Sequence, residues 1–287
     1  MQRLEVFQSL WAMTRRPWQG EEMPLDEMMR RIAQAGFDGV DIVYGDYPLD
    51  ELEPLLRQHQ LACTVTAFPS SIEGLQPALQ LAVTLRARHL NIIGAVYPFS
   101  VSDGAAYVRG WLRLCADAGM PVTIETHRDC ITTDLLYTLQ LMDAVPEMAL
   151  CADLSHFVVG REFKWPITAE VQAQVEAVLD RSNSFQGRVA SREQIQLQIS
   201  FPHHSEWYDQ FADWWRYGFR SWRRRHEPDA VLNFLCELGP REYAMTGADG
   251  EELSDRWQEA LMIRDRVRGI WAEVKREDTG AARGATE

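Results

Sequence analysis

With 287 residues, 46% of them hydrophobic, the chain can bury a full core and fits one large α/β barrel or two small domains. Its formal net charge of −13 argues against nucleic acid as a partner, because phosphates bind to basic surfaces. The sequence has no N-terminal signal pattern, and no apolar run reaches membrane-spanning length. We therefore expect a cytoplasmic protein without a membrane partner.

The five cysteines form no Cys-x-x-Cys pair, and their irregular spacing argues against a disulfide framework or a structural zinc site. We expect most of them to be reduced, buried and equivalent to small hydrophobic residues. They are Cys63, Cys115, Cys130, Cys151 and Cys236.

Eight apolar segments that are typical of β-strands alternate with eight segments whose apolar residues recur at helical spacing. The predicted strands comprise residues 4–13, 39–44, 62–68, 90–94, 122–127, 149–156, 185–189 and 230–237. The predicted helices comprise residues 26–35, 49–60, 74–87, 104–118, 133–144, 168–180, 206–225 and 253–274. Residues 277–287 are charged, small and glycine-rich, and we expect them to form a frayed tail.

This alternation indicates parallel βαβ units, and eight such units in 287 residues predict a (β/α)8 TIM barrel of the α/β class. We expect a single domain over residues 1–276. A doubly wound sheet is the competing architecture, and it normally carries a glycine-rich phosphate turn after its first strand. Here the first strand runs into Trp11-Ala12-Met13-Thr14-Arg15-Arg16, which contains no such turn.

The strand predicted at 122–127 ends in an acid and an imidazole, Glu125 and His127. Period-2 alternation places both on the same face as Thr123. A carboxylate on the inner face of a buried strand must be paired, protonated or bound to a metal. This strand end is therefore the first candidate for a functional site.

Three later strands also end in polar groups, at Asp153, Gln186 and Glu237. In a TIM barrel the carboxyl ends of the strands meet at one mouth. The carboxylates of Glu125, Asp153 and Glu237 would repel each other there unless a cation neutralised them. Oxygen ligands suit Mn²⁺, Mg²⁺ or Co²⁺.

Each of these residues also has a structural interpretation. Glu125 and Glu237 fit buried ion pairs or hydrogen-bonded acids, and Asp153 fits a cap of the turn that follows it. Gln186 fits a hydrogen-bond donor to the neighbouring carboxylates, without a metal.

Three motifs resemble the metal site of the xylose isomerase-like TIM barrels, a superfamily that includes sugar isomerases, epimerases and type-IV AP endonucleases. The motifs are Glu125-Thr126-His127, Asp153-Leu154-Ser155-His156 and Cys236-Glu237-Leu238-Gly239-Pro240. The resemblance implies metal ligation by Glu125, Asp153 and Glu237, and a contact of His156 with a substrate hydroxyl. The family usually places a histidine ligand where this chain has Gln186. A glutamine oxygen binds Mn²⁺ or Mg²⁺ less strongly than imidazole binds transition metals.

The resemblance implies a divalent-metal-dependent isomerase or epimerase of a small sugar or related polyhydroxy carbonyl compound, which acts by proton transfer through an enediolate. Glu125 and Glu237 would exchange the proton. His156, Arg188 and His127 would orient substrate oxygens, and Gln186 would complete the metal shell. A homo-oligomer is compatible with the sequence.

Two further functions remain open. One is a non-catalytic barrel that binds a sugar-like ligand or a partner and has a degenerate metal site. The other is an enzyme acting on abasic DNA, which the negative charge disfavours.

Three other segments have more than one interpretation. Residues 194–198 alternate Gln with apolar residues and fit either a strand across the mouth or an exposed two-faced strand. His203 and His204 fit metal ligands or a solvated loop. The helix predicted at 206–225 carries an aromatic stripe that fits a sugar-binding wall, a subunit interface or packing on the barrel.

Overall fold

The chain folds into a closed barrel of eight parallel strands in sequence order, β1 to β8, as the sequence predicts. Our computed structural model describes residues 1–15 and 21–284. The strands are β1 (Arg3–Ser9), β2 (Gly39–Val43), β3 (Ala62–Ala67), β4 (Leu90–Ile92), β5 (Val122–Glu125), β6 (Leu150–Ala152), β7 (Ser182–Gln186) and β8 (Val231–Cys236).

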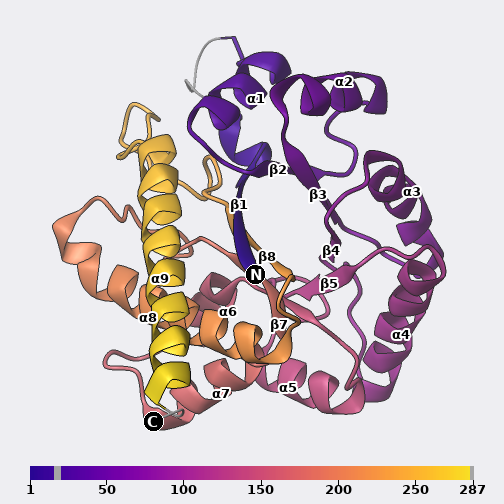
Figure 1. Cartoon of the computed structure of the whole chain (residues 1–287), viewed down its shortest axis with the longest axis vertical. Coiled ribbons are helices and arrows are strands. Elements are labelled where there is room, and N and C mark those ends of the chain that lie inside the picture. Colours follow the sequence, from indigo (N-terminus) through magenta and orange to yellow (C-terminus); the bar gives the residue numbers. More distant parts are fainter. Residues whose placement is uncertain (16–20, 285–287) are drawn as a thin grey trace.

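Helices connect the strands and form a ring around the barrel (Figure 1). They are α1 (Leu25–Gln34), α2 (Leu49–His59), α3 (Gln76–Leu85), α4 (Val101–Asp117), α5 (Leu135–Ala144), α6 (Leu154–Gly160), α7 (Ala169–Leu179), α8 (Ser205–Arg225) and α9 (Arg256–Gly284). Short 3₁₀ turns occur at Trp11–Met13, Glu73–Leu75 and Pro202–His204. Within the described residues, we find no helix with the length and apolar character needed to span a membrane.

The predicted limits differ most from the structure in three strands. The first strand stops at Ser9, and Trp11–Met13 forms a 3₁₀ turn. The sixth stops at Ala152 because the Asp153 side chain caps the N-terminus of α6, which the sequence did not predict. The seventh begins at Ser182 rather than Phe185. Its first residues are polar and face the barrel interior, so they lack the apolar pattern by which a strand is predicted.

The C-terminal helix α9 continues through Gly284, so it includes most of the segment predicted as a tail. Residues 285–287 lie outside the described part of the chain. The tail beginning at residue 277 stays a prediction.

The aromatic stripe of α8 belongs to the core. Its members Phe211, Trp214, Trp215, Phe219 and Trp222 are each at most 1% exposed. Edge-to-face contacts join this stripe to both neighbouring strands, with centroids 5.5 Å apart for Phe219 and Phe185 and 5.3 Å for Trp215 and Phe234. Packing on the barrel is therefore the correct interpretation for these five rings. All five cysteines are free and buried, which confirms the prediction for them.

The interior of the barrel is polar on one side. The Asp41 Oδ1 atom accepts hydrogen bonds from the hydroxyl groups of Thr64 at 2.7 Å and Thr66 at 3.0 Å. On the next strands Thr123 donates to the Asn91 Oδ1 atom at 3.1 Å. These buried hydrogen bonds tie neighbouring strands of the barrel to one another.

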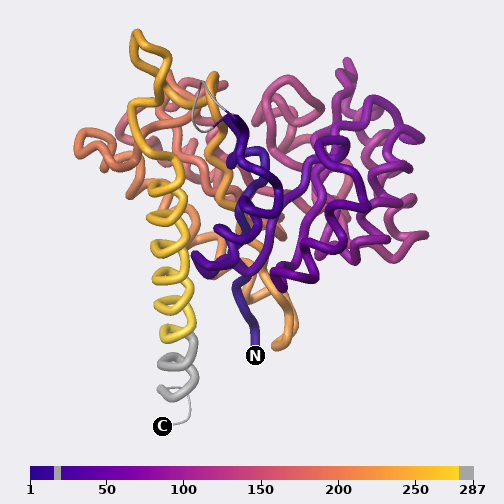
Figure 2. The backbone as a smooth tube through the Cα atoms, turned by 90° about the horizontal axis from the view of Figure 1, so that it is seen from above, coloured from indigo at the N-terminus to yellow at the C-terminus, as the bar shows by residue number. Residues whose placement is uncertain are grey.

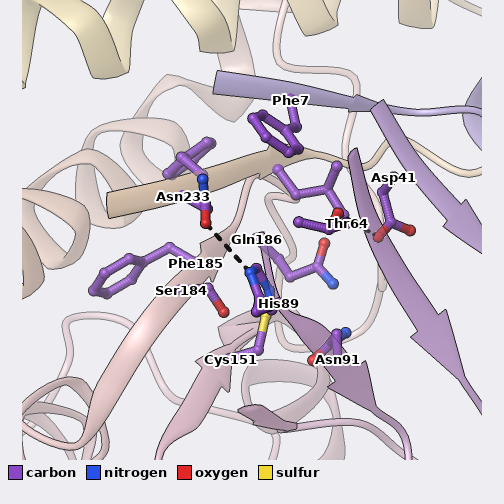
Figure 3. Close-up of a pocket in the computed structure, with 12 residues that line it drawn as sticks. Phe7, Asp41, Thr64, His89, Asn91, Cys151, Ser184, Phe185, Gln186 and Asn233 are labelled. Atoms are coloured by element: carbon purple, nitrogen blue, oxygen red, sulfur yellow. Dashed lines mark hydrogen bonds between the residues drawn. The ribbon is translucent and has the colours of Figure 1, made fainter. Parts of the chain in front are cut away.

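A cavity of about 10 Å³ lies among these inward side chains, close to the volume that one water molecule needs (Figure 3). Its lining includes Asp41, Asn91, Gln186 and Asn233, and Asn233 is hydrogen-bonded to the His89 ring at 3.3 Å. Gln186 thus reaches the same polar interior from β7 that Asp41 and Asn91 reach from β2 and β4.

The barrel closes between its first and last strands, which pair in register from Arg3 with Val231 to Gln8 with Cys236. Helix α9 then runs along the side of the barrel (Figure 2). At its first residue the buried Arg256 guanidinium donates hydrogen bonds to the carbonyl oxygen atoms of Ala12 and, at 2.8 Å, of Thr14. The last helix thereby holds the loop that follows the first strand.

Candidate active site

The four predicted ligands lie at the carboxyl ends of four consecutive strands. Glu125 and Gln186 are the last residues of β5 and β7, and Asp153 and Glu237 directly follow β6 and β8. One carboxylate oxygen from each of the three acids lies within 4.8 Å of the others. The convergence expected from the sequence is therefore present, although the role of each residue stays a prediction.

Glu125 is 1% exposed and is held by two side-chain amides. Its Oε2 atom accepts hydrogen bonds from Asn91 Nδ2 and, at 2.7 Å, from Gln186 Nε2. Burial, followed by the charges of Glu237 and Asp153, raises the pKa of Glu125 well above its ordinary value. A cation or a proton is thus required to neutralise this end of the barrel.

Asp153 divides its two oxygen atoms between two environments. Its Oδ1 atom accepts hydrogen bonds from the backbone N–H of Ser155 at 3.0 Å and from the Ser155 hydroxyl at 2.5 Å, so it caps α6. Among the described residues its Oδ2 atom has no hydrogen-bond partner. The nearest cationic or imidazole groups to Oδ2 are His156 at 3.5 Å and Arg188 at 3.9 Å. The capping interpretation therefore accounts for one oxygen and leaves the other available.

Gln186 donates its amide nitrogen to Glu125, as the metal-free interpretation predicts, yet its carbonyl oxygen is buried without a partner in the described part of the chain. Unpaired buried acceptors are costly and rare. The unpaired Asp153 oxygen and the neighbouring carboxylates of Glu125 and Glu237 are a donor set that fits an oxygen-liganded divalent cation, and Gln186 would add its oxygen if its amide turned.

Glu237 pairs with Arg188 across the ends of β7 and β8. The Glu237 Oε2 atom lies 2.9 Å from Arg188 Nη2, and Arg188 Nε donates to the Glu237 carbonyl oxygen at 3.1 Å. Burial raises the pKa of Glu237 to about 8, although the Arg188 guanidinium opposes the shift.

Arg188 is 2% exposed, and its guanidinium carbon lies 4.4 Å from the ring centroid of Tyr243. Arg128 lies over the same ring at 4.7 Å. Tyr243 thus fixes the guanidinium from the loop after β8.

Two histidines adjoin the carboxylates. The strand ends before His127, so the predicted alternation does not place this residue, but its side chain still faces the mouth. Its ring centroid lies 4.0 Å from that of His156 in the first turn of α6. Burial lowers the pKa of both imidazoles, of His156 more strongly. Burial therefore favours the neutral form of both rings.

A cavity of about 340 Å³ opens above these groups. Sequence reasoning missed several residues around it, namely Trp11, Phe68, Asn91 and Tyr243, of which Trp11, Phe68 and Tyr243 line the cavity. Of these, Asn91 had a readable signal, because an amide in the middle of an apolar strand needs a buried partner. Trp11 lies in a 3₁₀ turn, and Phe68 and Tyr243 lie in loops, where no periodicity identifies them.

Residues 194–198 form neither the strand across the mouth nor the exposed two-faced strand considered from the sequence. Gln196 and Gln198 are each 4% exposed, and Gln196 Nε2 donates to the Gly239 carbonyl oxygen at 3.0 Å. This segment is a buried loop joined to the loop after β8. His203 is exposed, consistent with the solvated-loop interpretation.

No protein-family model and no curated protein matches the sequence. Solved structures do match. A xylose isomerase-like TIM barrel protein from Mycobacterium smegmatis in complex with magnesium has 15% identity and a TM-score of 0.59, with 93% of this chain and 97% of that chain covered. A D-psicose 3-epimerase determined in the presence of D-fructose has 12% identity and a TM-score of 0.59, with coverage of 93% and 99%.

A third match, a probable 3-DHS dehydratase from Bacillus anthracis, has 15% identity and a TM-score of 0.55, with coverage of 83% and 94%. The chain therefore has the fold of the xylose isomerase-like TIM barrels. This fold carries more than one activity, so the activity must be argued from the residues of the mouth.

Proposed function

We propose that this chain is a divalent-metal-dependent isomerase or epimerase of a small sugar or related polyhydroxy carbonyl compound. The observation that supports this most is the cluster of Glu125, Asp153 and Glu237, whose ligand oxygens lie within 4.8 Å of one another beside a cavity of about 340 Å³. The similarity in fold to a D-psicose 3-epimerase supports the same class.

In this proposal Glu125, Asp153 and Glu237 hold Mn²⁺, Mg²⁺ or Co²⁺, and Gln186 contributes its carbonyl oxygen. The ion would polarise a carbonyl group and the adjacent hydroxyl group of the substrate. The proposed contribution of Gln186 requires its amide to turn, because the amide nitrogen now faces Glu125 at 2.7 Å. An amide turn of this kind exchanges a donor for an acceptor without moving the backbone.

The two glutamates are proposed to move the proton. One carboxylate takes the proton from the carbon beside the carbonyl, which leaves an enediolate, and the other carboxylic acid returns a proton to carbon. Burial raises the pKa values of Glu125 and Glu237, which favours the protonated form of these carboxyl groups where no ion is bound. Arg188, whose Nη1 atom has no hydrogen-bond partner in the described chain, would donate to a substrate oxygen, and His127 and His156 face the same substrate.

The test follows carbon-bound hydrogen directly. Purified protein is stripped with a chelator, reloaded with Mn²⁺, Mg²⁺ or Co²⁺, and incubated with a panel of ketoses in D₂O. We expect metal-dependent incorporation of deuterium beside the carbonyl of at least one sugar. Absence of exchange with every ketose and every metal, in protein that binds the metal by calorimetry, would contradict the proposal.

A non-catalytic binding barrel is the second candidate, and the contact of Gln186 Nε2 with Glu125 favours it, since this contact satisfies the acid without an ion. Elemental analysis of the purified protein separates the two candidates. A metal-free protein whose melting temperature does not change when cations are added would favour the non-catalytic binding barrel.

A further inference from the structure

A second cationic side chain, in addition to Arg188, lies beside the mouth. Arg128 follows β5, and its guanidinium carbon lies 4.7 Å from the ring centroid of Tyr243 in the loop after β8. Strands β6 and β7 separate β5 from β8 around the barrel. The contact between Arg128 and Tyr243 therefore spans the carboxyl ends of β6 and β7, where Asp153 and Gln186 lie.

Arg128 has a positive charge that the described residues leave uncompensated. The side chain is exposed, and within the described chain no carboxylate oxygen lies within 4.0 Å of its guanidinium nitrogen atoms. A second positive charge is nevertheless close, because the Arg188 guanidinium carbon lies 4.4 Å from the same Tyr243 ring centroid. Two guanidinium groups beside one ring repel each other, and an anion that contacts both of them relieves this repulsion.

Arg188 has an unused hydrogen-bond donor. Its side chain is 2% exposed, and its Nη2 atom lies 2.9 Å from a Glu237 oxygen. Within the described residues its Nη1 atom has no hydrogen-bond partner, and the distance of 3.9 Å to an Asp153 oxygen is too long for a hydrogen bond. A buried donor without a partner is costly, and Arg188 lines the cavity of about 340 Å³. The Nη1 atom is therefore available to a ligand in that cavity.

The charges of the mouth balance without Arg128. In the proposed function the carboxylate cluster has three negative charges, and the divalent ion together with Arg188 has three positive charges. Arg128 then adds a surplus positive charge on the side of β6 and β7. Asp46 also lines the cavity, but it lies in the loop after β2, which is opposite β6 in the ring of strands. An anionic group of a substrate is therefore attracted to Arg128 and repelled by Asp46.

We propose that the substrate has a carboxylate group, which Arg128 binds at the mouth together with the Nη1 atom of Arg188. This substrate class rests on the proposed function and narrows it to a polyhydroxy carbonyl acid. A carboxylate has one negative charge, which matches the one surplus guanidinium, and two acceptor oxygens for two guanidinium groups. A phosphate ester has nearly two negative charges at pH 7 and exceeds this balance.

The experiment measures binding and needs no turnover. The full chain is saturated with Mn²⁺ and titrated by calorimetry with small sugar acids, each compared with the neutral sugar that has CH₂OH in place of the carboxylate. D-Fructuronate and D-fructose are one such pair, and D-fructose 6-phosphate is the phosphate counterpart. We expect at least one acid to bind about tenfold more tightly than its neutral partner, because hydrogen bonds between charged groups are the stronger ones. This preference should shrink as salt is added, because salt screens the attraction.

Arg128→Met should lower the affinity for that acid about tenfold and so remove the preference over the neutral sugar. Arg128→Lys should retain part of the preference, because it keeps the charge but loses the planar fork and the stacking on Tyr243. Arg113→Met is the matched control, since Arg113 is an exposed arginine of α4 and its loss changes the net charge of the chain equally. This control should keep the preference of the wild type. Circular dichroism checks that each variant is folded.

Three results would overturn the proposal: acids that bind no more tightly than their neutral partners, a preference that persists in Arg128→Met, or a phosphate ester that binds more tightly than the matching acid. The second result would mean that the carboxylate binds to the ion rather than to Arg128. Deuterium exchange is measured separately, so the two proposals fail separately. Exchange in neutral ketoses without a preference for acids contradicts only the carboxylate site, and a preference for acids without exchange in any substrate contradicts only the isomerase or epimerase activity.

Discussion

Arg188→Met tests the electrostatic account of the mouth most directly. The substitution removes a guanidinium that is 2% exposed, lies 2.9 Å from a Glu237 oxygen and lies 3.9 Å from an Asp153 oxygen. Breaking a buried pair by removing one partner costs about 3–5 kcal/mol, because the remaining charge is left uncompensated. For a chain of this size, at about 2–4 °C per kcal/mol, the melting temperature of the metal-free protein at pH 9, where Glu237 is ionised in the wild type, should fall by about 6–20 °C.

The size of this loss should depend on pH. Burial raises the pKa of Glu237 to about 8, and Arg188 acts against that shift. Without Arg188 the pKa rises further, so the carboxyl group stays protonated and neutral to a higher pH. The loss of stability caused by Arg188→Met is therefore smallest near pH 5, where Glu237 is neutral in both proteins. This loss grows as the pH rises toward 9.

The assay is thermal or urea unfolding of chelator-treated protein at pH 5, 7 and 9. Arg188→Lys is the matched control, since it keeps the charge but loses the planar fork and the stacking on Tyr243, and it should lie between the wild type and Arg188→Met. A Met variant as stable as the wild type at pH 9, or one with the same deficit at every pH, would refute this reasoning. Saturating Mn²⁺ should restore part of the stability by neutralising the carboxylates.

Three further outcomes are expected. Gln186→His should tighten Mn²⁺ or Co²⁺ binding about tenfold, or about 1.4 kcal/mol, with little gain for Mg²⁺, because imidazole binds borderline metals more strongly than an amide oxygen does. Identical titrations for the wild type and the variant would exclude Gln186 as a metal ligand. Glu125→Gln should lower deuterium exchange by about 10²–10⁴-fold, and an active variant would contradict the proton-transfer role. The same substitution should raise the melting temperature of the metal-free protein at pH 8, because the neutral amide relieves the repulsion from Glu237 and Asp153. Mn²⁺ affinity should increase as the pH rises from 6 through about 8, because burial raises the pKa of Glu237 to about 8 and the ion needs the carboxylate. Calorimetry in two buffers should detect the released proton, and an affinity that does not change with pH would exclude Glu237 as a ligand.

The barrel could be predicted because its strands and helices alternate with distinct periodicities, and residues at strand ends then follow from the topology. Glu125 and Glu237 were identifiable in this way. Asn91 was not paired with Glu125, because partners on neighbouring strands depend on register, which periodicity does not determine. Helix α6 was missed because Asp153 both ends a strand and caps a helix.

The positions of the loop residues could not be predicted. Tyr243 contacts Arg188 and Arg128 only because the loop after β8 folds back across the mouth. Strand β5 ends at Glu125, two residues before His127. The alternation predicted the correct side for His127, but the loop conformation, not the strand, places it there. Loop conformations depend on tertiary contacts that have no local signature in the sequence.

The contact of Arg256 with the carbonyl oxygens of Ala12 and Thr14 has a consequence for synthesis. β1 is synthesised before the other strands of the barrel, but its partner β8 and the arginine that holds its following loop lie more than 220 residues later. Both edges of the growing sheet therefore stay unpaired until β8 has been synthesised. We expect ribosome-bound chains that end before residue 231 to expose the edge of β1 and to recruit chaperones, and chains that end between β8 and α9 to close the barrel with a loosely held first loop.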